Sequence, residues 1–117
     1  MSEPTTSPSD PTRAPLVVAV ARSDDEVVMS LTGELDPHTA PVLRKAIDEL
    51  GPDIGATSLV LDLRNLRFID SSGLRVVISA HRLMDERGGR LILRSPSATA
   101  RRILSVTGLA DQMTIED

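Results

Sequence analysis

Cysteine is absent from the 117-residue sequence, and so are tryptophan and tyrosine. Without cysteine the chain can form neither a disulfide framework nor a thiolate metal site. The single aromatic residue, Phe68, cannot supply the series of stacking surfaces by which many proteins bind single-stranded nucleic acid. These absences argue against a disulfide-bonded domain, a cysteine-ligated metal centre and a single-strand-binding protein.

Positive charge and long apolar runs are also scarce. The net charge is −4 and no basic run exceeds two residues, which disfavours DNA binding. No apolar run approaches the roughly 18 residues that a membrane-spanning helix needs. The first ten residues combine acidic residues with prolines, unlike the basic start and apolar stretch of a secretory signal. We therefore expect a soluble, cytoplasmic protein.

What is present suits one small domain. Hydrophobic residues make up 40% of the chain, enough for a core without metal or disulfide support, and no cofactor is expected. Residues 1–15 hold four of the eight prolines and hardly any apolar side chain, so we expect them to form a disordered tail. The domain should then run over 16–117, and a monomer is the default for this size.

The spacing of apolar residues predicts a β-hairpin followed by a helix. Two apolar runs, 16–21 and 27–31, flank a polar spacer, which is typical of antiparallel strands joined by a turn. The chain is expected to leave the second strand at 32–36. Thr39 is the best N-cap of the helix, because Pro41 is tolerated only in its first turn. The expected apolar face of this helix comprises Val42, Leu43, Ala46, Ile47 and Leu50.

A buried strand and a second helix come next. Residues 59–63 are almost continuously apolar, which indicates a strand paired in parallel inside a sheet. Residues 65–71 are expected to connect this strand to a helix over roughly 72–86.

Three weaker elements complete the chain. They are a strand at 90–94, a helix with Ser95 as N-cap and Pro96 in its first turn, and a final strand at 113–115. The order β-β-α-β-α-β-α-β predicts an α/β domain with a mixed sheet of four or five strands and three to four helices.

Residues 68–74, with the sequence FIDSSGL, are the most informative segment. Its two leading apolar residues should fix the approach to the second helix, and Asp70, Ser71 and Ser72 meet the helix start. Unpaired N–H groups of the first turn and the helix dipole would favour a phosphate on Ser71. Gly73 has no side chain and would allow a partner's backbone to come close. Plain N-capping by Asp70 or Ser71 is the alternative on composition alone.

Catalysis has little support in the sequence. His38 and His81 are the only histidines. His81 falls on the apolar side of the second helix, where a structural role is favoured, and His38 lies at a helix entry. A Ser71–His38–Asp36 triad can be imagined, but Asp36 and His38 are too close in sequence for a persuasive orienting pair. No glycine-rich phosphate loop or metal-ligand cluster is visible, so we expect a protein that is not an enzyme.

Three motifs together resemble the signature of STAS domains. They are GELDPHTA at 33–40, DSSGL at 70–74, and SP at 95–96 leading into TGL at 107–109. In particular they resemble the bacterial anti-sigma factor antagonists, and the similarity runs from about Leu16 to the C-terminus. The resemblance implies a STAS-like single domain whose helices pack largely on one side of the sheet.

The resemblance also implies roles for individual residues. In that family the first serine of the DSSG motif is phosphorylated by the anti-sigma factor, an ATP-binding serine kinase. That serine is Ser71, with Ser72 as the fallback. The unphosphorylated antagonist binds the anti-sigma factor and frees a sigma factor, and a phosphatase resets the phosphorylated form. The residues implied in partner binding are Asp36, Asp70, Ser72, Gly73 and Arg75.

One departure from the family pattern bears on how such a switch would work in this chain. Arg75 stands where the best-known members often have a glycine, and it adds bulk and charge beside Ser71. We expect a local electrostatic and steric switch with little change in the backbone. The alternatives are a STAS scaffold subunit, a small-ligand or nucleotide-sensing module, and a structural domain in which Ser71 is only a helix cap.

Overall fold

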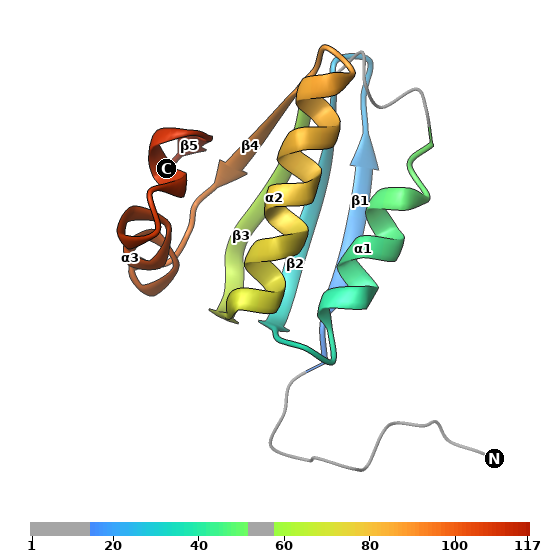
Figure 1. The fold of residues 1–117 in the computed structure, drawn as a ribbon. Coiled ribbons are helices and arrows are strands. Elements are labelled where there is room, and N and C mark those ends of the chain that lie inside the picture. The colour runs from blue at the N-terminus through green and yellow to red at the C-terminus, as the bar shows by residue number, and fades with distance from the viewer. Residues whose placement is uncertain (1–14, 52–57) are drawn as a thin grey trace, which may run out of the picture.

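The computed structural model describes residues 15–51 and 58–117, so the predicted disordered tail, apart from Pro15, lies outside the described residues. Five strands form one sheet in the order β1-β2-β3-β4-β5, with β1 antiparallel to β2 and the other neighbours parallel (Figure 1). The elements are β1 (Val17–Arg22), β2 (Glu26–Leu35), α1 (Ala40–Asp48), β3 (Ser58–Ile69), α2 (Ser71–Glu86), β4 (Arg90–Arg94), α3 (Ala98–Val106), the 3-10 helix η2 (Leu109–Asp111) and β5 (Thr114–Glu116). The predicted element order and the mixed α/β sheet are confirmed.

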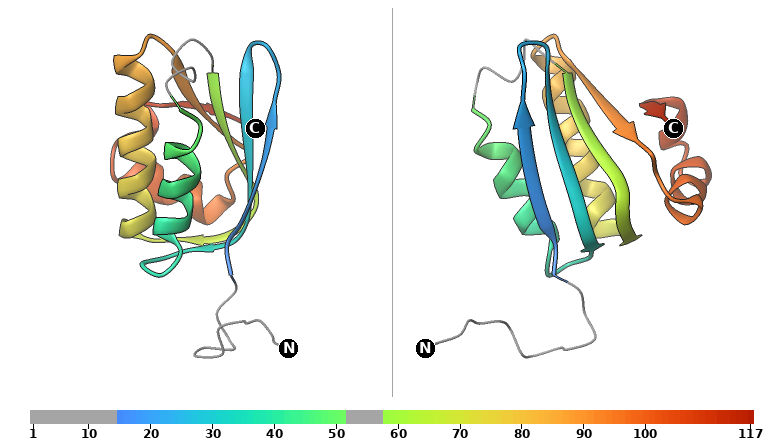
Figure 2. Two further views of the ribbon diagram at one scale, coloured as in Figure 1. Left: turned by 90° about the vertical axis from the view of Figure 1, so that its right-hand side faces the viewer. Right: turned by 180° about the vertical axis from the view of Figure 1, so that it is seen from behind.

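The helices pack on one face of the sheet, as Figure 2 shows in its left-hand view. Strand β2 explains this arrangement, because its buried and partly exposed residues alternate along most of its length. Its buried residues Val27 and Met29 pair with Leu59 and Leu61 of β3, and α2 packs against β3 and β4. The core therefore lies between the sheet and the helix layer. Its packing holds in place the ends of β2 and β3, next to which the candidate site lies.

Both central strands run further than the sequence predicted. Strand β2 continues to Leu35 and β3 to Ile69, so the expected departure at 32–36 and the connection at 65–71 are both wrong. The pairing continues through two register shifts, one between Ser30 and Thr32 and one between Gly33 and the next residue. At the end of β3 the buried residues Leu63, Leu66 and Ile69 are spaced three apart, so the pattern there did not indicate a strand. Strand β2 keeps its alternation of buried and more exposed residues through Leu35.

Helix α1 begins where the sequence predicted, with Thr39 at the N-cap position and Pro41 in the first turn. One member of its predicted apolar face is wrong, because Val42 is 45% exposed. The helix instead buries residues spaced three and four positions apart, namely Ala40, Leu43 and Ile47.

Helix α3 starts two residues later than expected. Its N-cap is Ser97, whose Oγ accepts a hydrogen bond from the Ala100 N–H at 3.1 Å. Ser95 instead has a φ of 55°, and Pro96 lies before the cap. The prediction of Ser95 as cap is therefore wrong. The left-handed conformation at Ser95 turns the chain between β4 and the helix.

The predicted weak last strand is present one residue later, as β5. Its Glu116 accepts a hydrogen bond from Arg94 Nε at 2.8 Å, between residues paired in the β4–β5 register. This hydrogen bond raises the pKa of Arg94 above its usual value. The side-chain pair thus joins a three-residue strand to the edge of the sheet.

Candidate functional site

The candidate site lies where β2 and β3 end side by side. Their last residues, Leu35 and Ile69, are paired in the sheet, and each is followed by an aspartate. The backbone N–H of Asp70 donates to the carbonyl oxygen of Leu35 at 3.1 Å, which ties the two exits together. Both α1 and α2 begin at this edge (Figure 1). Asp36 and Ser71 therefore each lie one residue from the same interstrand hydrogen bond.

Asp70 is the N-cap of α2. Its Oδ1 accepts hydrogen bonds from the backbone N–H groups of Ser72 at 2.8 Å and Gly73 at 3.1 Å, and its carbonyl accepts from Leu74 N–H at 2.9 Å. Capping by Asp70, one of the two expected alternatives, is therefore what the structure contains. The expectation that the first-turn N–H groups remain unpaired is wrong for Ser72 and Gly73, whereas the Leu74 bond is the first regular bond of the helix. A phosphate on Ser71 would find them already bonded.

Ser71 occupies the first position of α2 and is exposed, whereas Ser72 is half-buried. Because Asp70 is the cap, the alternative in which Ser71 caps the helix is wrong. The Ser71 hydroxyl makes no hydrogen bond with any residue in 15–51 or 58–117. The fold thus leaves this hydroxyl without a structural task in the described part of the chain.

Gly73 is buried beneath the first turn of α2. A Cβ at this position would lie 2.6 Å from Cγ of Leu35 and 3.0 Å from Cγ1 of Ile69. The glycine therefore lets α2 pack closely on the two strand ends. Sequence reasoning missed this contact for two reasons. Leu35 is distant from Gly73 in the chain, and Ile69 was not expected to belong to β3.

Asp36 is only 6% exposed and is held inside the turn between β2 and α1. Its Oδ1 accepts from the N–H groups of His38 at 2.9 Å and Thr39 at 3.0 Å. The Thr39 hydroxyl donates to the Glu34 carbonyl at 2.7 Å and accepts from the Asp36 N–H at 2.9 Å. The aspartate expected to contact a partner is thus engaged in shaping the turn beside Ser71.

Comparison with known proteins agrees with this geometry. A family model described as "Mlab, STAS domain" matches residues 18–116. The chain belongs to the STAS domain family. It is 35% identical over 91 residues to the anti-sigma F factor antagonist of Paenibacillus polymyxa, covering 78% of each chain. It is 30% identical over 98 residues to the anti-sigma-B factor antagonist of Bacillus subtilis (strain 168), covering 84% of this chain and 88% of that protein.

Solved structures match this STAS domain over its full fold. The anti-sigma factor antagonist SpoIIAA, a Bacillus cell fate determinant, matches in its unphosphorylated form with a TM-score of 0.71 and in its phosphorylated form with 0.67. Both are 31% identical to this chain and cover 85% of it, and the matches span 87% and 90% of those chains. The STAS-like fold expected from the three motifs is confirmed.

The catalytic alternative receives no support from the described part of this STAS domain. Within it, no hydrogen bond joins Ser71 to His38, and no group of three or more His, Cys, Asp or Glu residues could hold a metal ion. His81 is half-buried on α2, and its Nδ1 has no hydrogen-bond partner among the described residues. The structural role of His81 therefore stays a prediction.

Phe68 differs from the sequence expectation. The sequence predicts that two apolar residues, Phe68 and Ile69, fix the approach to α2, but only Ile69 is buried, and Phe68 is 47% exposed. Phe68 pairs with Glu34 of β2, whose carboxylate lies 3.9 Å from the Arg67 guanidinium. The register shift that precedes this pair explains why simple alternation did not place the side chain.

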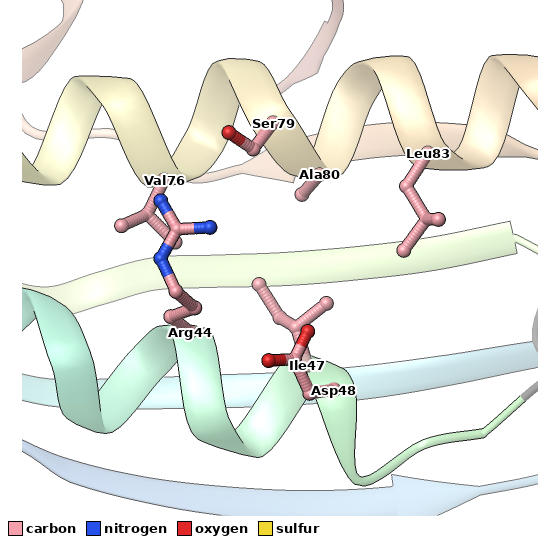
Figure 3. A pocket seen from close by; sticks show the side chains of 7 residues that line it. All are labelled: Arg44, Ile47, Asp48, Val76, Ser79, Ala80 and Leu83. Atoms are coloured by element: carbon pink, nitrogen blue, oxygen red, sulfur yellow. The ribbon is translucent and has the colours of Figure 1, made fainter.

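A shallow groove of about 180 Å³ runs between α1 and α2 of the STAS domain (Figure 3). Its α2 wall belongs to the same helix that begins at Ser71, and Figure 3 shows the Arg44 side chain extending from α1 toward Val76. The lining residues are Arg44, Ile47, Asp48, Val76, Ser79, Ala80 and Leu83. Sequence reasoning missed this groove, because it predicted each helix face separately and not the gap between them.

Among the helices in the described part of the chain, none is long and apolar enough to span a bilayer.

Proposed function

We propose that this STAS domain is an anti-sigma factor antagonist that is switched by phosphorylation of Ser71. The unmodified protein binds an anti-sigma factor with serine kinase activity, and the phosphorylated protein releases it until a phosphatase removes the phosphate. The observation that carries the proposal is that Asp70, and not Ser71, caps α2. Asp70 caps the helix, so the exposed Ser71 hydroxyl is available to a kinase without loss of a structural bond.

The names of the relatives support this assignment. Two relatives at least 30% identical are anti-sigma factor antagonists, and SpoIIAA exists in both an unphosphorylated and a phosphorylated form. Regulation of a sigma factor would place the protein in the cytoplasm, as a monomer that acts by binding and not by catalysis.

The switch itself follows from charge and packing. Phosphorylation adds a charge of about −1.5 to −2 at neutral pH and a bulky group at an exposed position. Asp36 and Asp70, which follow the ends of β2 and β3, already place two carboxylates at this end of the sheet, and the phosphate would add to their negative charge. Disrupting the centre of an interface commonly costs about 2 kcal/mol or more, which corresponds to about thirtyfold weaker binding. No backbone rearrangement is required.

The neighbouring residues would take different parts in the interface. Asp70 and the exposed Arg75 lie close to Ser71 in sequence and would border the contact. The buried Asp36 would act through the shape of its turn, and Gly73 through the position of α2. Partner residues that extend along α2 would reach the groove between α1 and α2.

The acceptor can be identified by incubating the protein with its cognate anti-sigma kinase and ATP and localising the phosphate by tandem mass spectrometry. We expect the label on Ser71 in the wild type, unchanged labelling of Ser72→Ala, and no label on Ser71→Ala. Ser79→Ala is the matched control, because Ser79 is an exposed serine on the same helix.

Two results would contradict the proposal. Label on Ser72 that survives Ser71→Ala would move the acceptor by one residue. An absence of label, together with binding of a scaffold protein or a nucleotide that is unaffected by Ser71→Asp, would favour the alternative STAS roles.

A further inference from the structure

We infer that Arg75 is the built-in counter-ion of a phosphate on Ser71, pairing with it across one turn of α2. This inference rests on the proposed function only in taking Ser71 as the phosphorylated residue. It assigns to Arg75 a task in the phosphorylated state, in addition to bordering the interface in the unmodified state.

The first reason is that the helix start cannot neutralise the phosphate by itself. Phosphates at helix N-termini are usually held by free backbone N–H groups of the first turn. Here the N–H groups of Ser72 and Gly73 already donate to the Asp70 carboxylate and that of Leu74 to the Asp70 carbonyl, so of the first-turn N–H groups only that of Ser71 itself is left for the phosphate. The Asp70 carboxylate also brings a negative charge to the same turn, so the phosphate needs a cation from elsewhere.

The second reason is the position of Arg75. It lies four residues after Ser71 on α2 and is exposed, as Ser71 is. Side chains at this spacing are neighbours on one helix face, and the order with the anion toward the N-terminus is the favourable one. A guanidinium can also donate two parallel hydrogen bonds to phosphate oxygens.

The third reason is that the guanidinium of Arg75 is available. It forms no hydrogen bond or ion pair with any residue in the described ranges, unlike Arg67, Arg94 and Arg101, which pair with carboxylates. Pairing with the phosphate would therefore break no existing contact. It would instead withdraw Arg75 from the partner surface at the moment when the phosphate appears.

The pairing can be measured on protein that carries phosphoserine at position 71 incorporated during translation, so that no kinase is needed. A phosphorus-31 NMR titration reports the second pKa of the phosphate, which is ordinarily about 6. We expect Arg75→Gln to raise this pKa by about half a unit, a threefold change in the protonation constant, and Arg75→Lys to retain part of the effect. The effect should shrink in 1 M salt.

Arg82→Gln is the matched control. Arg82 is also exposed on α2, but it lies eleven positions from Ser71, a rise of about 16 Å and beyond the Debye length at physiological salt. All variants keep the remaining charged groups on the elements around this helix start, namely Glu34, Asp36, His38, Arg44, Arg67 and Asp70. Circular dichroism of each variant verifies that α2 is intact.

The inference is overturned if the phosphate titrates identically with arginine and glutamine at position 75, or if Arg82→Gln shifts the pKa as much as Arg75→Gln. Because phosphoserine is built in, this result is independent of the kinase experiment. A chain whose Ser71 is never labelled by a kinase would refute the proposed function and leave the pairing measurement valid.

Discussion

The two neighbouring strands β2 and β3 are each followed by an aspartate, and the two aspartates have different structural roles. After β2, Asp36 is buried and organises a turn. In this turn the Thr39 hydroxyl accepts a hydrogen bond from the Asp36 N–H and donates one to the Glu34 carbonyl. At the exit of β3, Asp70 caps α2 directly, and the Ser71 hydroxyl that follows is exposed. The Thr39 hydroxyl takes part in the hydrogen bonds of its turn, whereas the Ser71 hydroxyl bonds to no described residue. Burial and bonding, and not residue type, distinguish them.

The difference arises from the length of the connection. Three residues separate Asp36 from the first residue of α1, so its carboxylate closes a turn. No residue separates Asp70 from α2, so its carboxylate reaches the first-turn N–H groups of Ser72 and Gly73, and Ser71 between them and the cap is exposed. Under the proposed function, a phosphate on Ser71 would therefore break no hydrogen bond among the described residues.

The largest expected effect comes from removing each aspartate in turn. Asp36→Ala should lower the free energy of unfolding by about 2 to 3 kcal/mol, because it removes the carboxylate that accepts from the N–H groups of His38 and the buried Thr39. Asp70→Ala should lower it by about 1 kcal/mol, since water can reach this partly buried cap. Urea unfolding measures both values. An equal or larger loss for Asp70→Ala would remove the distinction between the exits.

The packing of α2 on the strand ends gives the next effect. Gly73→Ala should cost about 2 kcal/mol in unfolding free energy, because the new methyl group would overlap Leu35. The double variant Gly73→Ala/Leu35→Ala should lose less than the sum of the two single losses, since the shortened side chain makes room. If the losses of the two single variants add up to the loss of the double variant in urea unfolding, the contact with Leu35 is not the reason for a glycine at position 73.

The smallest effect concerns the two hydroxyls themselves. Thr39→Val should lower the unfolding free energy by about 1 to 2 kcal/mol, whereas Ser71→Ala should change it by less than about 0.5 kcal/mol. Thermal unfolding of the pair under identical conditions is sufficient to compare them. A Ser71→Ala loss as large as that of Thr39→Val would mean that the fold depends on this hydroxyl too.

Much of this arrangement could be predicted from local signals. The helical spacing of apolar residues located α2, and Asp70 and Ser71 were identified as the two candidate caps at its start. Which residue caps could not be decided from composition, because aspartate and serine are both common N-caps. The coordinates decide it in favour of Asp70.

Features that depend on contacts between distant residues escaped prediction. The last residues of β2 and β3 pair across two register shifts, and the end of β3 buries every third residue and not every second, so its sequence lacks strand alternation. The close contact of Gly73 with Leu35 and the exposure of Phe68 both follow from that realigned pairing. The burial of Asp36 likewise depends on how the β2–α1 turn folds back on the strand end, which sequence spacing does not reveal.

The most direct measurement compares the affinity of the cognate anti-sigma factor for the unmodified protein and for protein with phosphoserine at position 71, by isothermal titration calorimetry. We predict binding at least about thirtyfold weaker for the phosphorylated protein, with the fold unchanged by circular dichroism. Equal affinity of the two forms would contradict the claim that this exposed hydroxyl controls the interface.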